Sequence, residues 1–196
     1  MPAVAVVGDP NTGKSVFSYL LFKEFIRRGA KVFRQEGDPA SPTSPWYLES
    51  GAEELRGKVK TPWDWRKVTW VRDSIQALKK TFDWVIVDAP GGRPPEERVT
   101  KELAEILKPV DSAIILCRSD NYEECVSGWT RELKQRAPHV QNLFTCTSTL
   151  EDSVSTFDPV SRRCVLVGLD RGQAREPRED LRRAISSIAD YLQGTF

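Results

Sequence analysis

The sequence lacks the features that mark a membrane protein or a protein that coats nucleic acid. No apolar run approaches the roughly 18 residues that are needed to cross a bilayer. The 29 basic residues almost cancel the 28 acidic ones, which leaves a net charge of +1. A near-neutral chain has no global field that attracts nucleic acid or an anionic bilayer. We therefore expect a cytoplasmic protein without membrane contact, in which any binding of a charged partner is local.

Histidine and cysteine are also scarce, with one histidine and four cysteines in the chain. The cysteines have no C-x-x-C spacing, and three of them lie in apolar or amphipathic runs. Because metal sites need ligands at matched spacing, we interpret the cysteines as buried free thiols rather than metal ligands. They are Cys117, Cys125, Cys146 and Cys164. His139 lies at a predicted joint between a helix and a strand, where a surface position is favoured over catalysis.

Apolar runs of strand length alternate with segments of helical periodicity along most of the chain. Helices and strands in this order require right-handed crossovers, which produce a parallel sheet that is covered on both faces. The predicted strands are 4–7, 31–34, 84–87, 113–117, 140–146 and 164–169. The predicted helices are 15–28, 68–80, about 96–107, about 122–136 and about 177–192. The 196 residues suit one domain. The sequence thus predicts a single α/β domain with a doubly wound, mostly parallel sheet between two helical layers.

Two segments interrupt this alternation. Residues 36–67 are rich in proline, serine and tryptophan, and residues 150–163 are polar without a clear period. Long connections in a compact domain are usually functional or disordered. Four tryptophans in this part of the chain alternate with basic residues: Trp46, Trp63, Trp65 and Trp70. Such rings can stack on a base or anchor an irregular loop by burial. We favour anchoring, and we expect part of 36–67 to form a lid.

A glycine-rich turn separates the first predicted strand from the first predicted helix. It reads Gly8-Asp9-Pro10-Asn11-Thr12-Gly13-Lys14-Ser15, which matches the pattern G-x-x-x-x-G-K-[ST]. The glycines allow successive N–H groups to surround an anion, and the helix adds its positive end. Lys14 is expected to reach the β- and γ-phosphates, and the Ser15 hydroxyl is expected to ligate magnesium. The nucleotide contacts predicted here are Gly8, Asn11, Thr12, Gly13, Lys14, Ser15 and Val16.

The third predicted strand ends in a carboxylate, in the run Trp84-Val85-Ile86-Val87-Asp88. An apolar strand that ends in an aspartate is how P-loop proteins order the shell of their magnesium ion. The alternative is that Asp88 only caps the end of the strand. Phosphoryl transfer depends on positioning and on charge neutralisation. Lys14, magnesium held by Ser15 and Asp88, and a carboxylate near the acceptor oxygen would supply both.

The chain resembles P-loop nucleotide hydrolases of the branch that includes MinD/ParA-type ATPases, signal-recognition GTPases and several small-molecule kinases. Residues 28–33 with Gly37-Asp38-Pro39 are similar to the second strand of that branch and its aspartate. Asp88-Ala89-Pro90-Gly91-Gly92 is similar to the third-strand loop, where glycine senses the γ-phosphate. The resemblance implies that Asp38 orients an attacking water or a substrate hydroxyl. Glu36 is the second candidate for this role. Asp38-Pro39 equally fits a simple turn.

The chain departs from this branch in two places. MinD-type proteins have an additional lysine early in the phosphate loop, where this chain has Asp9, which weakens the expectation of a dimer joined by that lysine. The Asn-Lys-x-Asp signature for guanine is missing, so adenine is favoured. Arg118 and Asp120, at the carboxyl end of the fourth strand, either contact the base or cap the next helix. Arg93 is either an internal arginine finger or a solvated arginine.

A narrower similarity is to the P-loop domain attached to some CRISPR-associated ring nucleases, in the spacing from the phosphate loop to the tryptophan-rich segment and on to 82–88. The nuclease module itself is not in this sequence, so the similarity would imply a partner protein or an independent activity. Three functions remain open. The first is a magnesium-dependent enzyme that hydrolyses ATP or transfers its γ-phosphate to a small acceptor, such as a nucleoside, nucleotide or short oligonucleotide. The second is an ATPase switch that controls a protein partner or a homodimer. The third is a nucleotide-binding adaptor with almost no hydrolysis.

Overall fold

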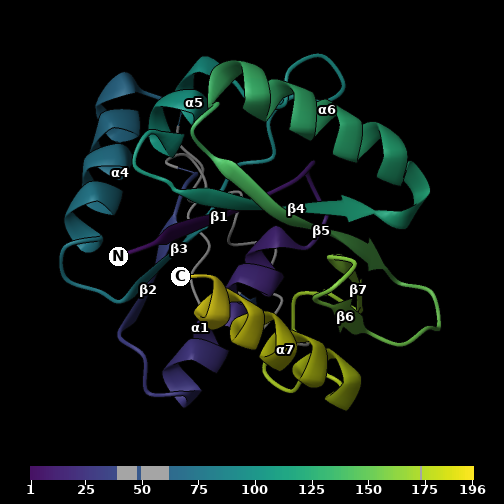
Figure 1. The fold of residues 1–196 in the computed structure, drawn as a ribbon. Coiled ribbons are helices and arrows are strands. Elements are labelled where there is room, and N and C mark those ends of the chain that lie inside the picture. Colours follow the sequence, from purple (N-terminus) through teal and green to yellow (C-terminus); the bar gives the residue numbers. More distant parts are fainter. Residues whose placement is uncertain (39–47, 50–61, 173) are drawn as a thin grey trace.

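A computed structural model describes residues 1–38, 48–49, 62–172 and 174–196 (Figure 1). In the described residues, seven strands form one sheet in the order β2-β3-β1-β4-β5-β7-β6. Neighbouring strands run parallel except for β6 and β7, which are antiparallel. The strands are β1 (Ala3–Val7), β2 (Val32–Glu36), β3 (Trp84–Asp88), β4 (Ser112–Arg118), β5 (Gln141–Thr149), β6 (Thr156–Asp158) and β7 (Arg163–Val167).

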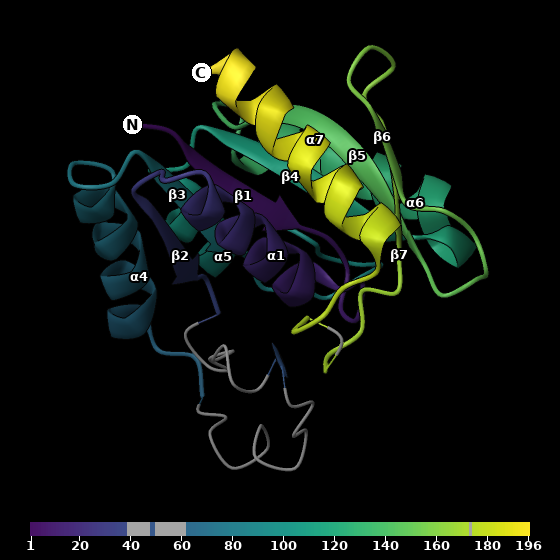
Figure 2. The ribbon, with the colours of Figure 1, turned by 90° about the horizontal axis from the view of Figure 1, so that it is seen from below.

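Helices cover both faces of this sheet. Figures 1 and 2 show α4, α5 and α6 on one face and α1 and α7 on the other. The helices are α1 (Lys14–Arg27), α4 (Trp65–Leu78), α5 (Lys101–Leu107), α6 (Tyr122–Arg136) and α7 (Glu179–Thr195), with a short 3-10 helix η1 (Ser119–Asn121) before α6. This arrangement confirms the predicted α/β domain with a doubly wound, mostly parallel sheet between two helical layers.

Each face of the sheet has its own apolar core. Along β1, Val4 and Val6 pack toward α1 and α7, whereas Ala3, Ala5 and Val7 pack toward the other helices. Every residue of β1 and of β3 is buried. Central parallel strands are buried on both faces, so their sequences are continuous apolar runs rather than alternating ones. This explains why these strands could be recognised in the sequence.

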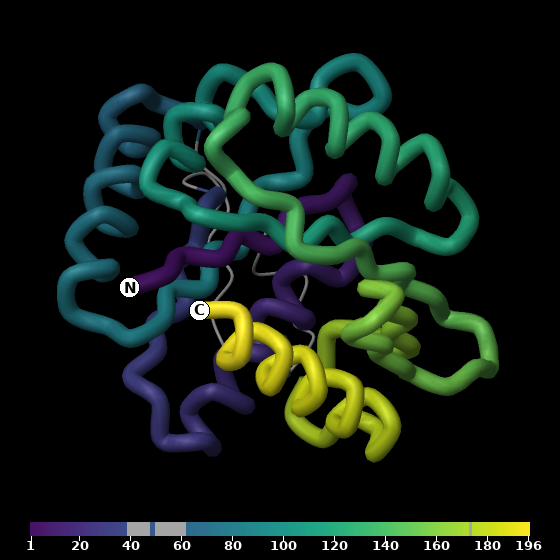
Figure 3. The backbone as a smooth tube through the Cα atoms, viewed as in Figure 1, coloured from purple at the N-terminus to yellow at the C-terminus, as the bar shows by residue number. Residues whose placement is uncertain are grey.

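The parallel register brings several strand ends to one edge of the sheet. Val6 of β1 pairs with Asp88 of β3, and Val7 pairs with Ile115 of β4. The loop that joins β1 to α1 therefore begins beside the carboxyl end of β3. At the opposite edge the two chain ends lie close together (Figure 3), and Met1, Gln193 and Phe196 line one shallow hollow there.

Two interpretations of individual side chains were wrong. Cys117 at the end of β4 forms a disulfide with Cys125 in α6, while Cys146 and Cys164 are buried free thiols as expected. Helix α6 follows β4 after only a short turn and packs back on the sheet, which brings the first two cysteines together. Of the four tryptophans singled out in the sequence, the three that the structure describes are exposed rather than buried anchors, by 39% for Trp63, 52% for Trp65 and 66% for Trp70. Trp46 lies outside the described residues.

The orientation of α4 explains the exposure of these rings. Its apolar stripe of Val68, Val71 and Ile75 faces the sheet and is buried. Trp65 and Trp70 fall outside that stripe and face the solvent. Most of the predicted lid at 36–67 lies outside the described residues. Among the described helices, none is long and apolar enough to cross a membrane, and His139 is exposed as expected.

Candidate functional site

The loop between β1 and α1 has a conformation that only glycine allows at two positions. Gly8 has a φ of 155°, and a Cβ added to it would lie 2.0 Å from the carbonyl oxygen of Leu116. Gly13 has a φ of 88°, and its added Cβ would lie 2.6 Å from the Cβ of Leu169. Both residues let the backbone turn tightly in front of α1. The loop therefore presents main-chain N–H groups and the helix N-terminus to the same space, as an anion requires.

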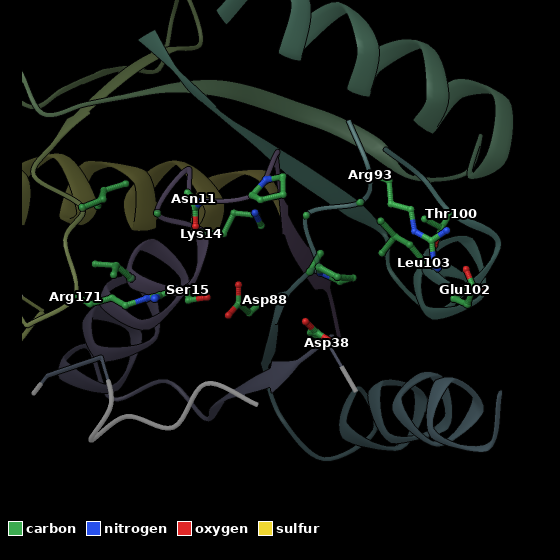
Figure 4. Close-up of a pocket in the computed structure, with 18 of the residues that line it drawn as sticks. Asn11, Lys14, Ser15, Asp38, Asp88, Arg93, Thr100, Glu102, Leu103 and Arg171 are labelled. Atoms are coloured by element: carbon green, nitrogen blue, oxygen red, sulfur yellow. Dashed lines mark hydrogen bonds between the residues drawn. The ribbon is translucent and has the colours of Figure 1, made fainter. Parts of the chain in front are cut away.

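Lys14 folds back over this loop. Its side chain is largely buried, and its Nζ donates a hydrogen bond of 2.7 Å to the carbonyl oxygen of Asp9. Thr12 Oγ1 donates to the same oxygen at 3.0 Å. Figure 4 shows Asn11 and Lys14 pointing into the cavity in front of the loop. The loop thus holds one ammonium group against its own backbone at the wall of the cavity.

Asp88 has two carboxylate oxygens in different surroundings. Oδ2 accepts a hydrogen bond of 2.6 Å from Nη2 of Arg34, and both side chains are 6% exposed. Oδ1 is buried without a hydrogen-bond partner among the residues that the structure describes. The carboxylate faces Ser15 across the cavity (Figure 4). A carboxylate oxygen and a hydroxyl are the hard oxygen ligands that Mg²⁺ prefers, so these residues fit a magnesium ion.

Arg34 is a site residue that the sequence analysis missed. It lies in β2 and donates to Glu36 at 3.4 Å and to the Ser18 hydroxyl at 2.9 Å, besides its bond to Asp88. The available signal was a basic residue in the middle of an otherwise strand-like run. A buried cation at that position requires a buried anion beside it, but the sequence does not show which one.

A cavity of about 790 Å³ lies in front of the loop. Its volume falls in the range of small-molecule sites. The predicted residues that line it are Asn11, Gly13, Lys14, Ser15, Val16, Asp38, Asp88 and Arg93. Gly8 and Thr12 are not part of the lining, and Thr12 is buried in the loop. The structure thus brings most of the predicted site residues into one cavity.

Arg118 and Asp120 are not among the residues that line this cavity. They form an ion pair with each other at the start of η1, and both side chains are more than half exposed. Neither provides a side-chain cap to α6, whose N-cap is Asn121. Contact of these two residues with a base therefore stays a prediction.

The two ends of the cavity contain residues that the sequence analysis did not select. One end is lined by Leu169, Asp170 and Arg171, in the loop that follows β7. The other is lined by Arg93 together with Thr100, Glu102 and Leu103 (Figure 4). Figure 4 shows Arg171 on one side of Ser15 and Lys14, and Arg93 on the other side. The loop after β7 could have been suspected, because ligands of open α/β sheets bind at the carboxyl ends of strands.

Charge at the second end is set by a local group of polar side chains. The pKa of Glu102 is lowered by hydrogen bonds from its own backbone and from Thr100, and further by the positive charge of Arg93. Thr100 also accepts a hydrogen bond of 3.2 Å from the N–H of Leu103 and so caps α5. This end of the cavity therefore offers one cation, one anion and a hydroxyl beside the buried Leu103.

Comparisons with known proteins show which solved structures have a similar fold. No family model and no curated protein sequence matches the chain. The fold is similar to that of septum site-determining protein MinD with Mg-ADP from Pyrococcus horikoshii OT3, at 13% identity and a TM-score of 0.66, covering 99% of this chain and 96% of that one. It is equally similar to a putative plasmid partition protein from Borrelia burgdorferi B31 bound to AMPPNP, at 12% identity, with a TM-score of 0.66 and coverage of 100% and 99%.

A third similar structure is cobyrinic acid a,c-diamide synthase from Mycobacterium smegmatis with bound ATP analog and magnesium. Its identity is 13% and its TM-score 0.60, and the match covers 98% of this chain and 95% of that one. At such identities the likeness establishes the fold, which is that of MinD/ParA-type P-loop ATPases. The resemblance stated from the sequence is confirmed at this level. The narrower similarity to the domain of CRISPR-associated ring nucleases finds no support in these matches.

Proposed function

We propose that this chain is a magnesium-dependent ATP-binding enzyme that hydrolyses ATP or transfers its γ-phosphate to a small acceptor. One observation carries the proposal. The Lys14 ammonium, the Ser15 hydroxyl and the Asp88 oxygen that has no hydrogen-bond partner among the described residues share one cavity at the start of α1. The three similar structures were obtained with Mg-ADP, AMPPNP, and an ATP analog with magnesium, which supports ATP and magnesium as the cofactors here.

The cavity suggests how a triphosphate would lie. The phosphates would occupy the N-terminal end of α1, beside Lys14 and the main-chain donors of the loop. Ser15 and Asp88 would hold Mg²⁺, which would neutralise charge on the phosphate oxygens. The base would extend toward Leu169 and Arg171. The absence of a guanine signature favours adenine.

The other end of the cavity would then receive the γ-phosphate and its acceptor. Asp38 lines the wall there and would orient an attacking water or an acceptor hydroxyl. Arg93 would meet the charge of the transferred phosphoryl group. Glu102 lies at the same end (Figure 4) and offers an anion to a second molecule, and Trp63 also lines the cavity. This room beyond the phosphates favours transfer to an acceptor over simple hydrolysis.

An ATPase switch is the second candidate, because the segment 91–99, whose first residues line the cavity, is connected to α6. The backbone N–H groups of Arg98 and Val99 both donate to Glu132 in α6 at 2.8 Å. A change near Gly91 on nucleotide binding would thus reach a surface helix, where a protein partner or a second copy of the chain would sense it.

Substitution of Lys14 tests whether the chain binds ATP at this loop. We expect Lys14→Ala to abolish binding of Mg-ATP in a calorimetric titration, because the phosphates lose the ammonium group that faces them. Lys79→Ala is the matched control, since Lys79 pairs with Asp111 at the end of α4 and does not line the cavity. Equal affinity of the Lys14 variant and the unmodified protein would defeat the assignment.

A second experiment separates the candidate functions. The purified protein is incubated with γ-labelled ATP and magnesium, alone and with a panel of nucleosides, nucleotides and short RNAs. Label that moves to one acceptor supports transfer. Label that appears only as free phosphate in every mixture contradicts transfer, and a rate that then rises with a protein partner or with protein concentration supports the switch. No release of label despite ATP binding supports an adaptor.

A further inference from the structure

Asp9 is the one acidic residue of the phosphate loop, and neither it nor the residues that bind its carboxylate line the cavity. The residue is 5% exposed. Its Oδ1 accepts hydrogen bonds from Nε of Arg98 at 3.0 Å and from Nε1 of Trp129 at 2.8 Å. Its Oδ2 accepts from Nη2 of Arg98 at 3.1 Å. Both oxygens are therefore held by residues that lie 89 and 120 positions away in the sequence.

Arg98 is as deeply buried as Asp9, since only 2% of its side chain is exposed. Its Nη2 also donates to Glu124 at 3.1 Å. Two glycines make room for it. A Cβ on Gly128 of α6 would lie 2.4 Å from Nη1 of Arg98. A Cβ on Gly92 would lie 2.3 Å from the backbone carbonyl oxygen of Arg98. The fold thus reserves a space for this arginine between the phosphate loop and α6.

The position of Asp9 creates an electrostatic problem for a loop that binds a polyphosphate. The carbonyl oxygen of Asp9 is the acceptor for the Lys14 ammonium, so the carboxylate belongs to the residue that this ammonium touches. A negative charge so close to the site would repel phosphate and compete for Lys14. The bidentate guanidinium of Arg98 neutralises the charge without entering the cavity.

Arg98 also links the loop to the segment 91–99. At the start of this segment, Gly91 packs against Pro10: a Cβ added to Gly91 would lie 2.8 Å from the Pro10 nitrogen. At the other end Arg98 reaches Asp9, one residue earlier in the loop. The segment is fixed to α6 by Glu132 and by Arg136, whose Nη1 donates to the carbonyl oxygen of Val99 at 2.6 Å.

We propose that Arg98 is a positioning residue of the nucleotide site, which neutralises Asp9 from within the same chain and so holds the phosphate loop ready for a polyphosphate. The inference rests on the proposed ATP binding. Arg98 does not line the cavity, so its effect on the ligand passes through Asp9. A purely structural role would make the loss of Arg98 equally harmful whether or not Asp9 is charged.

The test is a Mg-ATP titration of three folded variants, with the unmodified protein measured first. We expect Arg98→Met to weaken binding by about tenfold or more, because Asp9 is left as an unpaired anion. The double variant Asp9→Asn/Arg98→Met should bind within about threefold of the unmodified protein, because the anion is gone. Arg136→Met is the control for the other link to the segment, and it should leave affinity within about threefold.

The possible failures are distinguishable. No binding by the unmodified protein refutes the proposed function itself. Binding by the unmodified protein together with unchanged affinity of Arg98→Met overturns the role of Arg98, as does a double variant that binds as weakly as Arg98→Met. If Arg98→Met does not fold, Asp9→Asn is compared with the double variant. A loss of about tenfold between those two would mean that Arg98 acts independently of the Asp9 charge, and would also overturn the proposal.

Discussion

At the scale of single residues, the Asp88 carboxylate combines a structural contact with the metal-binding role that we propose for it. One oxygen is bound to Arg34, which keeps the side chain in place, and the other is buried and unpartnered among the described residues. A buried unpartnered acceptor costs free energy. In a protein that binds magnesium, that cost is relieved when the ion arrives. The unsatisfied oxygen is therefore the feature of Asp88 that points to a ligand.

We expect Asp88→Asn to lower the affinity of the nucleotide complex for Mg²⁺ by at least about tenfold, because the ion loses an anionic ligand. The measurement is a magnesium titration of the protein with ATP after removal of metal by a chelator. Asp83→Asn is the control, because Asp83 lies before β3 at the opposite edge of the sheet and accepts a hydrogen bond from the Lys31 N–H. Similar magnesium affinity in both variants would contradict a role for Asp88 in holding the ion.

The residues of the site differ in how far the sequence could predict them. Lys14 and Ser15 were predictable because their chemistry depends on a local loop, and a loop of eight residues fixes their spacing. Asp88 was predictable because it ends an apolar strand. Arg34 and Arg98 were not, because their partners lie 54 and 89 positions away. Asp9 was recognised only as a departure from the expected lysine, and its meaning depends on the fold.

At the scale of elements, the sequence of α6 includes a glycine that leaves room for the side chain of Arg98. Gly128 lies in the middle of this helix, where glycine is less favourable than alanine by about 0.8–1.0 kcal/mol. The glycine is explained by Arg98, since an added Cβ would lie 2.4 Å from its guanidinium. The lower helix propensity of Gly128 is thus the cost of the space that Arg98, the partner of Asp9, occupies.

Alanine at this position should therefore destabilise the protein in spite of its helix propensity. We expect Gly128→Ala to lower the free energy of unfolding by about 1–3 kcal/mol, the usual range for overpacking a well-packed site. Urea denaturation measures it. Gly194→Ala in α7 is the control, because an added Cβ there meets nothing within 4 Å, and it should be neutral or stabilising by up to about 1 kcal/mol. If both substitutions stabilise the protein equally, Gly128 is not making room for Arg98.

Element boundaries were predictable where a local signal marks them. Helix α6 matches its predicted range of 122–136. Helix α5 begins at Lys101 rather than near residue 96, because Thr100 caps it and because Arg93 and Glu97 form an isolated bridge pair before it. Strand β6 was missed, because its three residues are exposed or half-buried and acquire strand geometry only by pairing with β7.

At the scale of the whole molecule, the sequence specified the class of the fold but not the order of its strands. Alternating apolar runs and helical stripes require a covered parallel sheet, whichever strand lies next to which. The order β2-β3-β1-β4-β5-β7-β6 places the loop after β1 between the ends of β3 and β4. That placement is what assembles Lys14, Asp88 and the segment 91–99 around one cavity, and it follows from tertiary packing.

Helix α7 packs on α1, and a group of charges fixes this contact. Arg28 at the end of α1 donates to Asp190 at 2.6 Å and to the carbonyl oxygen of Ser186 at 2.7 Å, both in α7. Arg28 is itself held by Glu24 at 2.8 Å. The hydrogen bond from Arg27, followed by those from Arg28 and Ser186, outweighs burial and lowers the pKa of Glu24 to about 2.

The lowered pKa predicts how stability depends on pH. A carboxyl group whose pKa is depressed on folding stabilises the folded state above its ordinary pKa of 4.5, and this contribution is lost as the pH falls toward about 2. We expect Glu24→Gln to lower the free energy of unfolding by about 1–3 kcal/mol at pH 7, because Arg27 is largely solvent-exposed and its share is screened. The deficit relative to the unmodified protein should shrink as the pH is lowered from 4.5 to 2. Urea denaturation across this range measures it, with the exposed Glu176→Gln as a control that should stay within about 0.5 kcal/mol throughout. A deficit that is independent of pH would show that the charge of Glu24 does not hold α7 to α1.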